Sequence, residues 1–117
     1  MDHNFPLPEE KKLTVIFRVE SGCLGPQGAT EVLRFCPFAQ QGMGPVEPDC
    51  INWKVIPRTN KTDPEIEFAI GGKLLTDSMA ERYLGMFGIC KDSLEMNMLD
   101  EITNLIDLFM GRPVRLN

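Results

Sequence analysis

The sequence has little of the material from which metal and hydrolytic sites are built. It holds one histidine, His3, in the N-terminal segment, and its four cysteines, Cys23, Cys36, Cys50 and Cys90, include no C-x-x-C pair. Zinc sites use clustered cysteine and histidine ligands, and Ser-His-Asp or Cys-His sites need a histidine held in the fold. We therefore expect no metal, no cofactor and no hydrolytic site.

The sequence also lacks export and membrane signals. No run of about 18 apolar residues is present, and residues 1–10 have neither the basic nor the apolar region of a secretory signal. We expect a cytoplasmic protein with no membrane association, in which a disulfide scaffold is not favoured. Cys36, Cys50 and Cys90 are then expected to be buried as small hydrophobic residues.

Positive charge is scarce. Twelve Lys and Arg residues stand against seventeen Asp and Glu residues, a net charge of −5, and the basic residues are scattered along the chain. Nucleic-acid binding proteins carry basic stripes, so we expect no nucleic-acid partner. The negative charge gathers in the C-terminal part, at Asp92, Glu95, Asp100, Glu101 and Asp107.

The remaining composition is that of one globular domain. The chain has 117 residues, of which 43% are hydrophobic and 25% charged, and a chain of this length can bury a core without disulfides or metal. Two prolines and no apolar periodicity in residues 1–11 predict a flexible tail. We expect a single domain at residues 12–111 and a C-terminal tail at residues 112–117.

Three segments alternate between apolar and polar residues, as half-buried strands do: residues 13–19, 51–56 and 65–70. The short polar connection at residues 58–64 predicts an antiparallel hairpin between the second and third strands. Gly71-Gly72 predicts a two-residue turn into a fourth short strand, residues 73–76.

Three helices are predicted. Residues 29–41 form the first, although Pro37 removes one hydrogen bond. Ser78 with Glu81 has the spacing of a capping box and opens the second, which ends before Gly88. The third begins at Asp92 or Ser93 and ends at Gly111.

The alternation of the strands predicts the layers. A sheet covered on both faces has continuously apolar strands, whereas these strands alternate. The prediction is an α+β two-layer sandwich of order β-α-β-β-β-α-α, with a mostly antiparallel four-stranded sheet and three helices on one face. Its expected core is Leu13, Val15, Phe17, Val19, Trp53, Val55, Ile66, Phe68, Tyr83, Leu84, Phe87, Ile102 and Phe109.

The loop after the first strand contains Gly22, Gly25 and Gly28. Amide groups at a helix start form a ready anion site. The glycine spacing, however, matches neither the dinucleotide nor the P-loop fingerprint. We interpret the glycines as residues that allow the bends of a connecting loop.

Short segments resemble thioredoxin-like proteins. Cys36-Pro37-Phe38 is similar to the Cys-Pro-Phe active-site segment of glutaredoxins and omega-class glutathione transferases, and Pro64 and the segment 78–84 resemble the proline and following helix of that family. The resemblance implies a thioredoxin-like α/β fold with helices on both sheet faces and a thiol-redox or glutathione-linked role. It also implies a reactive cysteine directly after the first strand, where Cys23 stands, while Cys36 lies inside the predicted helix.

The predicted C-terminal helix has the widest apolar surface. Its apolar residues span roughly 200° of the helix, against about 100° for a helix docked on one side. Surplus apolar area marks a partner surface or a helix wedged between two neighbours. We expect a homodimer, or another protein partner, at this helix, with Leu105, Leu108 and Phe109 near the two-fold axis and Met98 at the margin. The polar stripe of Asp100, Asn104 and Asp107 is expected to face solvent.

Two functions follow from these observations. The first is a non-enzymatic protein-binding or assembly module, because no catalytic or metal set is assembled while one helix has surplus apolar surface. The alternative is a thioredoxin-like thiol protein that uses Cys23 or Cys36 together with Pro64.

Overall fold

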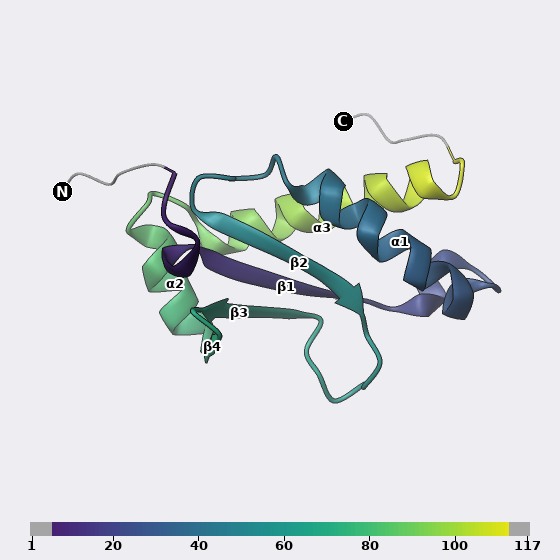
Figure 1. The fold of residues 1–117 in the computed structure, drawn as a ribbon, viewed down its shortest axis with the longest axis horizontal. Helices are drawn as coiled ribbons and strands as arrows, with labels where there is room; N and C mark the ends of the chain where they lie inside the picture. The colour runs from purple at the N-terminus through teal and green to yellow at the C-terminus, as the bar shows by residue number, and fades with distance from the viewer. Residues whose placement is uncertain (1–5, 113–117) are drawn as a thin grey trace.

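The computed structural model describes residues 6–112, and its element order is the predicted β-α-β-β-β-α-α (Figure 1). The helices and strands are β1 (Leu13–Val19), α1 (Gly28–Met43), β2 (Ile51–Pro57), β3 (Ile66–Ile70), β4 (Lys73–Leu75), α2 (Asp77–Gly85) and α3 (Lys91–Phe109). Two 3-10 turns, η1 (Glu9–Lys11) and η2 (Ser21–Leu24), flank β1.

The four strands form one mixed sheet in the order β2-β1-β3-β4. β2 is parallel to β1, whereas β3 is antiparallel to β1 and β4 is antiparallel to β3. The predicted hairpin between residues 51–56 and 65–70 is therefore wrong, because β1 lies between these strands. The helical crossover through α1 places β2 beside β1 in parallel, and residues 58–65 then carry the chain past the end of β1 to its other side.

Hydrogen bonds fix this crossing at the carboxyl end of β1. The amide of Arg58 donates to the carbonyl of Val19 over 2.9 Å, and the amide of Arg18 donates to the carbonyl of Glu65 over 2.8 Å. β1 is thus held on both sides at this end. The loop after β1 and the start of β3 consequently lie next to each other.

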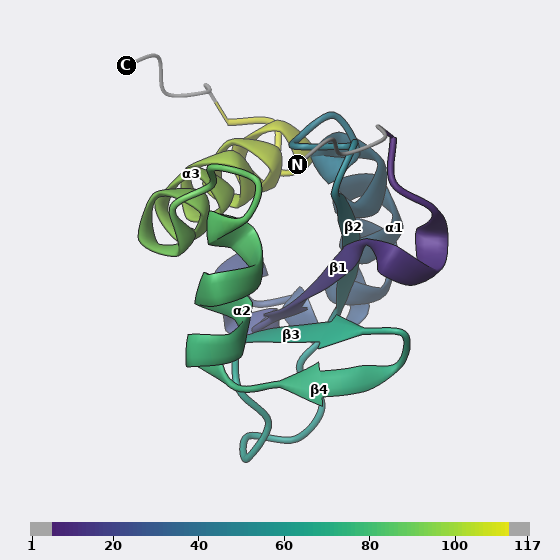
Figure 2. The same ribbon diagram turned by 90° about the vertical axis from the view of Figure 1, so that its left-hand side faces the viewer.

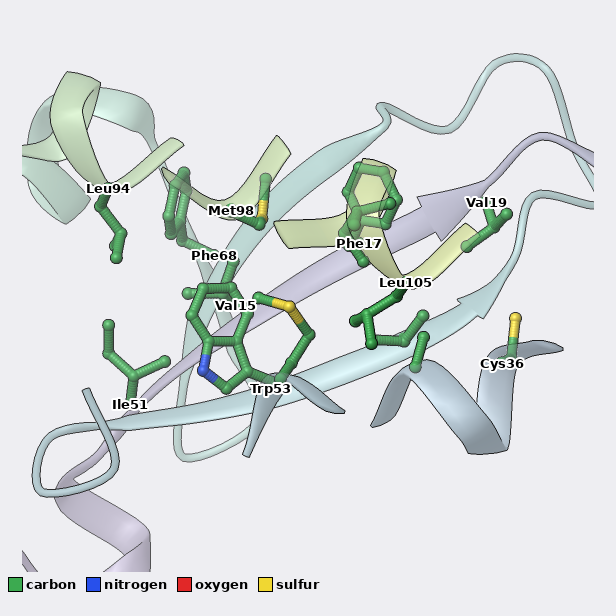
Figure 3. Packing of buried hydrophobic residues seen from close by; sticks show 14 of the residues in the cluster. Val15, Phe17, Val19, Cys36, Ile51, Trp53, Phe68, Leu94, Met98 and Leu105 are labelled. Atoms are coloured by element: carbon green, nitrogen blue, oxygen red, sulfur yellow. The ribbon is translucent and has the colours of Figure 1, made fainter. Parts of the chain in front are cut away.

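One face of the sheet packs against all three helices, as predicted. Alternate residues of β1, from Leu13 to Val19, are buried in a single cluster with residues of β2, β3, α1, α2 and α3. Figure 2 shows α2 and α3 on one side of the sheet and α1 beside β2, and Figure 3 shows Leu94, Met98 and Leu105 within the cluster. The fold is the two-layer α+β sandwich, and residues 6–112 do not place helices on both sheet faces as the thioredoxin-like resemblance implied.

The opposite sheet face is mostly polar. Ile16 and Ala69 are buried there but belong to no part of the main cluster. Arg18 crosses this face and forms an ion pair of 2.9 Å with Glu67 on β3. The mostly polar outer face that the strand alternation predicted is therefore present in the structure.

Part of the predicted flexible tail contacts the fold. The amide of Leu7 donates to the carbonyl of Asp49 over 2.9 Å, and Leu7 packs against the core cluster. Glu9 in η1 accepts a 2.7 Å hydrogen bond from the side-chain amide of Asn52 on β2. Residues 6–11 therefore extend the domain, while residues 1–5 and 113–117 of the two predicted tails lie outside the described residues.

The helix boundaries differ from the prediction by one or two residues, and at α2 the capping residue also differs. α2 begins after Thr76, whose side-chain oxygen accepts a hydrogen bond from the amide of Met79. Ser78 is inside the helix, so the predicted capping box is wrong. Thr76 has the extended backbone that a capping residue needs, because it directly follows β4.

Most of the predicted core is buried, namely Leu13, Val15, Phe17, Val19, Trp53, Val55, Phe68, Leu84 and Ile102. Four predicted members, Ile66, Tyr83, Phe87 and Phe109, are only half-buried. No helix in residues 6–112 has the length and hydropathy needed to cross a bilayer.

Candidate functional site

α3 divides its apolar residues between the core and the surface. Met98 and Leu105 are 1% and 5% exposed and lie inside the protomer. These two predicted interface residues are thus part of the protomer core, and the expected dimer stays a prediction. The physical reason is that α3 packs against α1 and α2 as well as the sheet, so a wider arc is buried than one-sided docking requires.

The other two predicted interface residues lie near the end of α3. Leu108 is 55% exposed. Phe109 is half-buried, with its ring 5.4 Å from that of Phe35 in an edge-on arrangement and 5.7 Å from that of Phe38. The guanidinium of Arg34 lies 5.9 Å above the Phe109 ring. Phe109 therefore joins α3 to α1 within the protomer.

A second set of residues on α3 points away from the core. At 3.6 residues per turn, Met96, Leu99 and Thr103 of α3 and Met110, which caps its end, fall within an arc of about 60°. We call these four residues the outer stripe. Met96 is 67% exposed, Leu99 40% and Met110 37%. Methionine suits an adaptable contact because its side chain is flexible and polarisable.

The outer stripe borders a small hollow at the carboxyl end of β1. This β1-end hollow has a volume of about 140 Å³. Phe17 and Val19 line it from β1, and Leu99, Ile102, Thr103 and Ile106 line it from α3. Three further lining residues, Glu20, Cys23 and Glu65, follow β1 or precede β3. The hollow thus has apolar walls with two carboxyl groups and one thiol among its lining groups.

Two arginines hold the chain beside this hollow. Arg58 forms an ion pair of 2.7 Å with Glu20 and donates to the carbonyls of Asp63 and Lys61. Arg18 donates to the carbonyl of Pro64 over 2.8 Å. The loop that leads to Glu65 is therefore tied to the end of β1.

The structure separates the two cysteines that the thioredoxin-like alternative names. Cys23 is exposed in η2 and lines the β1-end hollow together with Glu65, the residue after Pro64. Cys36 is buried in α1, and burial raises the pKa of its thiol to about 11. Of the two, only Cys23 lies at the hollow.

The two remaining cysteines differ from each other. Cys50 is buried, as expected, and burial raises the pKa of its thiol. Cys90 was expected to be buried but is exposed, because it occupies the N-cap position of α3 ahead of the first core turn. The backbone amide of Ser93 lowers the pKa of the Cys90 thiol. In residues 6–112, no three His, Cys, Asp or Glu side chains are grouped to hold a metal ion.

The glycines after β1 serve close packing. A Cβ atom at Gly28 would lie 1.8 Å from the carbonyl oxygen of Ser21, and the Gly28 amide already donates to the carbonyl of Gly25. Gly25 has a φ of +84°. These glycines let η2 fold against the start of α1, which agrees with their interpretation as a connecting loop.

Sequence reasoning did not find the β1-end hollow. Glu20 and Glu65 gave no signal, because their proximity depends on β3 pairing with β1, and the expected hairpin had placed β3 elsewhere. A signal for the outer stripe was present in the spacing of Met96, Leu99, Thr103 and Met110. Dividing the wide apolar arc into two stripes at helical spacing predicts one buried set and one exposed set.

No protein-family model, curated protein or solved structure matches this chain.

Proposed function

We propose that this chain is a non-enzymatic protein-binding module of the cytoplasm that contacts a protein partner through the outer stripe of α3 and the adjacent β1-end hollow. The observation that carries the proposal is the exposure of Met96, Leu99 and Met110 along one stripe of α3. Removing apolar surface from water favours association. An apolar stripe beside a hollow combines a broad contact with a place for an anchoring side chain.

The test compares two pairs of aspartate substitutions at exposed apolar residues. Met96→Asp/Leu99→Asp places charge on the outer stripe, while Leu33→Asp/Leu74→Asp places it on α1 and β4, where the side chains are 67% and 63% exposed. Proteins captured from a cell extract by the tagged wild-type chain are identified and their affinities measured with purified components. We expect the outer-stripe pair to weaken binding at least tenfold and the control pair to weaken it less than twofold. If both pairs of substitutions bind the captured partners with the same affinity, the proposal is contradicted.

A thiol function at Cys23 is the second candidate. The observation in its favour is that Cys23 and the residue after Pro64 line one hollow. Its weakness is chemical, because reactive thiolates are stabilised by neighbouring cations, whereas the charged residues that line the hollow are Glu20 and Glu65.

Alkylation of the native chain separates the two candidates. Rates at each cysteine are measured by mass spectrometry from pH 6 to 10. A binding module is expected to react at Cys90 before Cys23, because the pKa of Cys90 is lowered, and to react slowly at the buried Cys36 and Cys50. A Cys23 that outpaces Cys90 below pH 7 favours the thiol function.

A further inference from the structure

Negative charge surrounds the outer stripe. From Asp92 to Asp107, α3 carries five carboxylates and neither lysine nor arginine. At 100° per residue, Asp100 and Asp107 border the outer stripe on one side, and the β1-end hollow with Glu20 and Glu65 borders it on the other. The exposed apolar surface therefore lies between two acidic borders.

Only some of these carboxylates are already paired. Glu20 pairs with Arg58, Glu95 with Lys91 and Asp107 with Arg112. Glu65 and Asp100 form no ion pair among residues 6–112, and both residues are exposed. One carboxylate on each side of the outer stripe is thus available to a cation.

The size of the β1-end hollow limits what enters it. Small-molecule sites usually enclose 300–1,000 Å³, and this hollow has about 140 Å³. Its apolar walls, Phe17, Val19 and Ile102 among them, suit one aliphatic side chain rather than a whole cofactor. A protein segment can supply such an anchor together with flanking charges.

We infer that the partner presents a cationic segment, with one aliphatic side chain for the β1-end hollow and lysine or arginine residues on both sides for Glu65 and Asp100. This inference rests on the proposed function and adds the chemistry of the partner. Complementary charge fixes orientation and accelerates association. A second copy of this chain fits poorly, because a symmetric contact on this face brings two sets of carboxylates together.

The probe is an 18-residue fluorescent peptide of leucine and lysine, patterned so that a helix has one leucine face and lysine flanks. A matched peptide has glutamate in place of every lysine. Binding to the full chain is followed by fluorescence anisotropy at two salt concentrations. We expect the lysine peptide to bind, with an affinity that falls as salt rises, and the glutamate peptide not to bind.

Two charge-reversed variants of equal net charge locate the binding. Glu65→Lys/Asp100→Lys changes the borders of the outer stripe, whereas Glu10→Lys/Glu81→Lys changes exposed residues on η1 and α2. We expect the first variant to bind the lysine peptide at least tenfold more weakly and the second to stay within twofold of wild type. Circular dichroism checks that both variants are folded.

Any of four results would overturn the inference. If the two charge-reversed variants weaken binding of the lysine peptide equally, the peptide is attracted by the overall negative charge of the protein. If the glutamate peptide binds, or if the lysine peptide does not bind, the partner does not need to be cationic. A wild-type dimer that Met96→Asp/Leu99→Asp dissociates assigns the surface to a second copy. In each case, if Met96→Asp/Leu99→Asp abolishes binding of a captured protein partner, the proposed function is still supported. Failure of the inference can therefore be told apart from failure of the proposed function.

Discussion

Gln40 closes the outer edge of β2. Its side-chain Nε2 donates to the carbonyl of Trp53 over 2.6 Å, and its Oε1 accepts from the amide of Val55 over 2.9 Å. These are backbone groups that a further strand would otherwise pair with, and unpaired strand edges invite association with other chains. Pro57 at the end of the same strand has no amide to offer. One side chain and one proline thus protect this edge.

We expect Gln40→Ala to lower the free energy of unfolding by roughly 0.5–1.5 kcal/mol, because two hydrogen bonds are lost at a partly hydrated edge. Gln40→Glu keeps an acceptor for Val55 but loses the donor to Trp53, so it should also be less stable than wild type at pH 7. Urea denaturation measures both changes. Gln41→Ala is the control, since its exposed side chain forms no hydrogen bond in the described part of the chain. A Gln40→Ala variant as stable as Gln41→Ala contradicts the assigned role.

The thiol of Cys36 makes stability depend on pH. Burial raises its pKa from 9.0 to about 11 in the folded chain, so the unfolded chain loses this proton first as pH rises. Stability from the neutral buried thiol is therefore complete below pH 9 and is lost as pH approaches 11. We expect wild type to lose about 2 kcal/mol more than Cys36→Ala between pH 8 and 11. Urea midpoints across this range provide the measurement, and parallel curves for the two proteins would sink the prediction.

The strands and helices were predictable from the sequence, but their pairing was not. Alternation in residues 13–19, 51–56 and 65–70 correctly gave three strands, because alternation reports which side chains face a core. It does not report which strand lies beside which. Residues 58–65 are long enough either for a hairpin or for a crossing past β1, and the pairing of β3 with β1 in the folded chain distinguishes the two.

The packing of α3 could not be predicted from its sequence either. The width of its apolar arc was predictable, but the neighbouring elements that bury this arc were not. Burial of Met98 and Leu105 depends on α1 and α2, which come together with α3 only in the folded chain. The same limit applied to the site. Cys23 could be predicted because it directly follows a strand, whereas the position of Glu65 beside it depends on the order of the strands in the sheet.

The contact between η2 and α1 predicts opposite behaviour for two glycines in one loop. A Cβ at Gly28 would lie 1.8 Å from the carbonyl oxygen of Ser21, whereas a Cβ at Gly22 meets nothing within 4 Å. We expect Gly28→Ala to lower the free energy of unfolding by about 2 kcal/mol or more, because backbone must move to relieve the overlap. Gly22→Ala should stay within about 0.5 kcal/mol of wild type. Thermal and urea unfolding test the pair, and equal stabilities would show that η2 does not pack on Gly28 in solution.

At the scale of the whole molecule, three helices and one sheet face share a single hydrophobic cluster. The opposite sheet face is mostly polar, and the outer stripe of α3 is an apolar surface that borders the β1-end hollow. α3 therefore has two separate roles. One side stabilises the fold through Leu94, Met98, Ile102 and Leu105, and the other is available for contact.

Aspartate substitutions on α3 separate these two roles. Leu105 is 5% exposed and touches the site of Gly42, where an added Cβ would lie 2.5 Å from it, whereas Leu108 is 55% exposed. Leu105→Asp buries an unpaired charge in the shared cluster, so we expect it to unfold the chain. Leu108→Asp should keep the wild-type circular dichroism and lose less than about 0.5 kcal/mol of stability.

Sedimentation adds the decisive comparison with the expected dimer. If Leu105 lay at a two-fold axis, Leu105→Asp would give a folded monomer of 13.2 kDa. Because Leu105 is instead part of the cluster that joins α3 to the sheet, its variant should sediment as an expanded or aggregated chain while Leu108→Asp stays compact. A folded, monomeric Leu105→Asp protein would mean that α3 detaches from the core without unfolding it, and the division of α3 into a core side and a contact side would then be wrong.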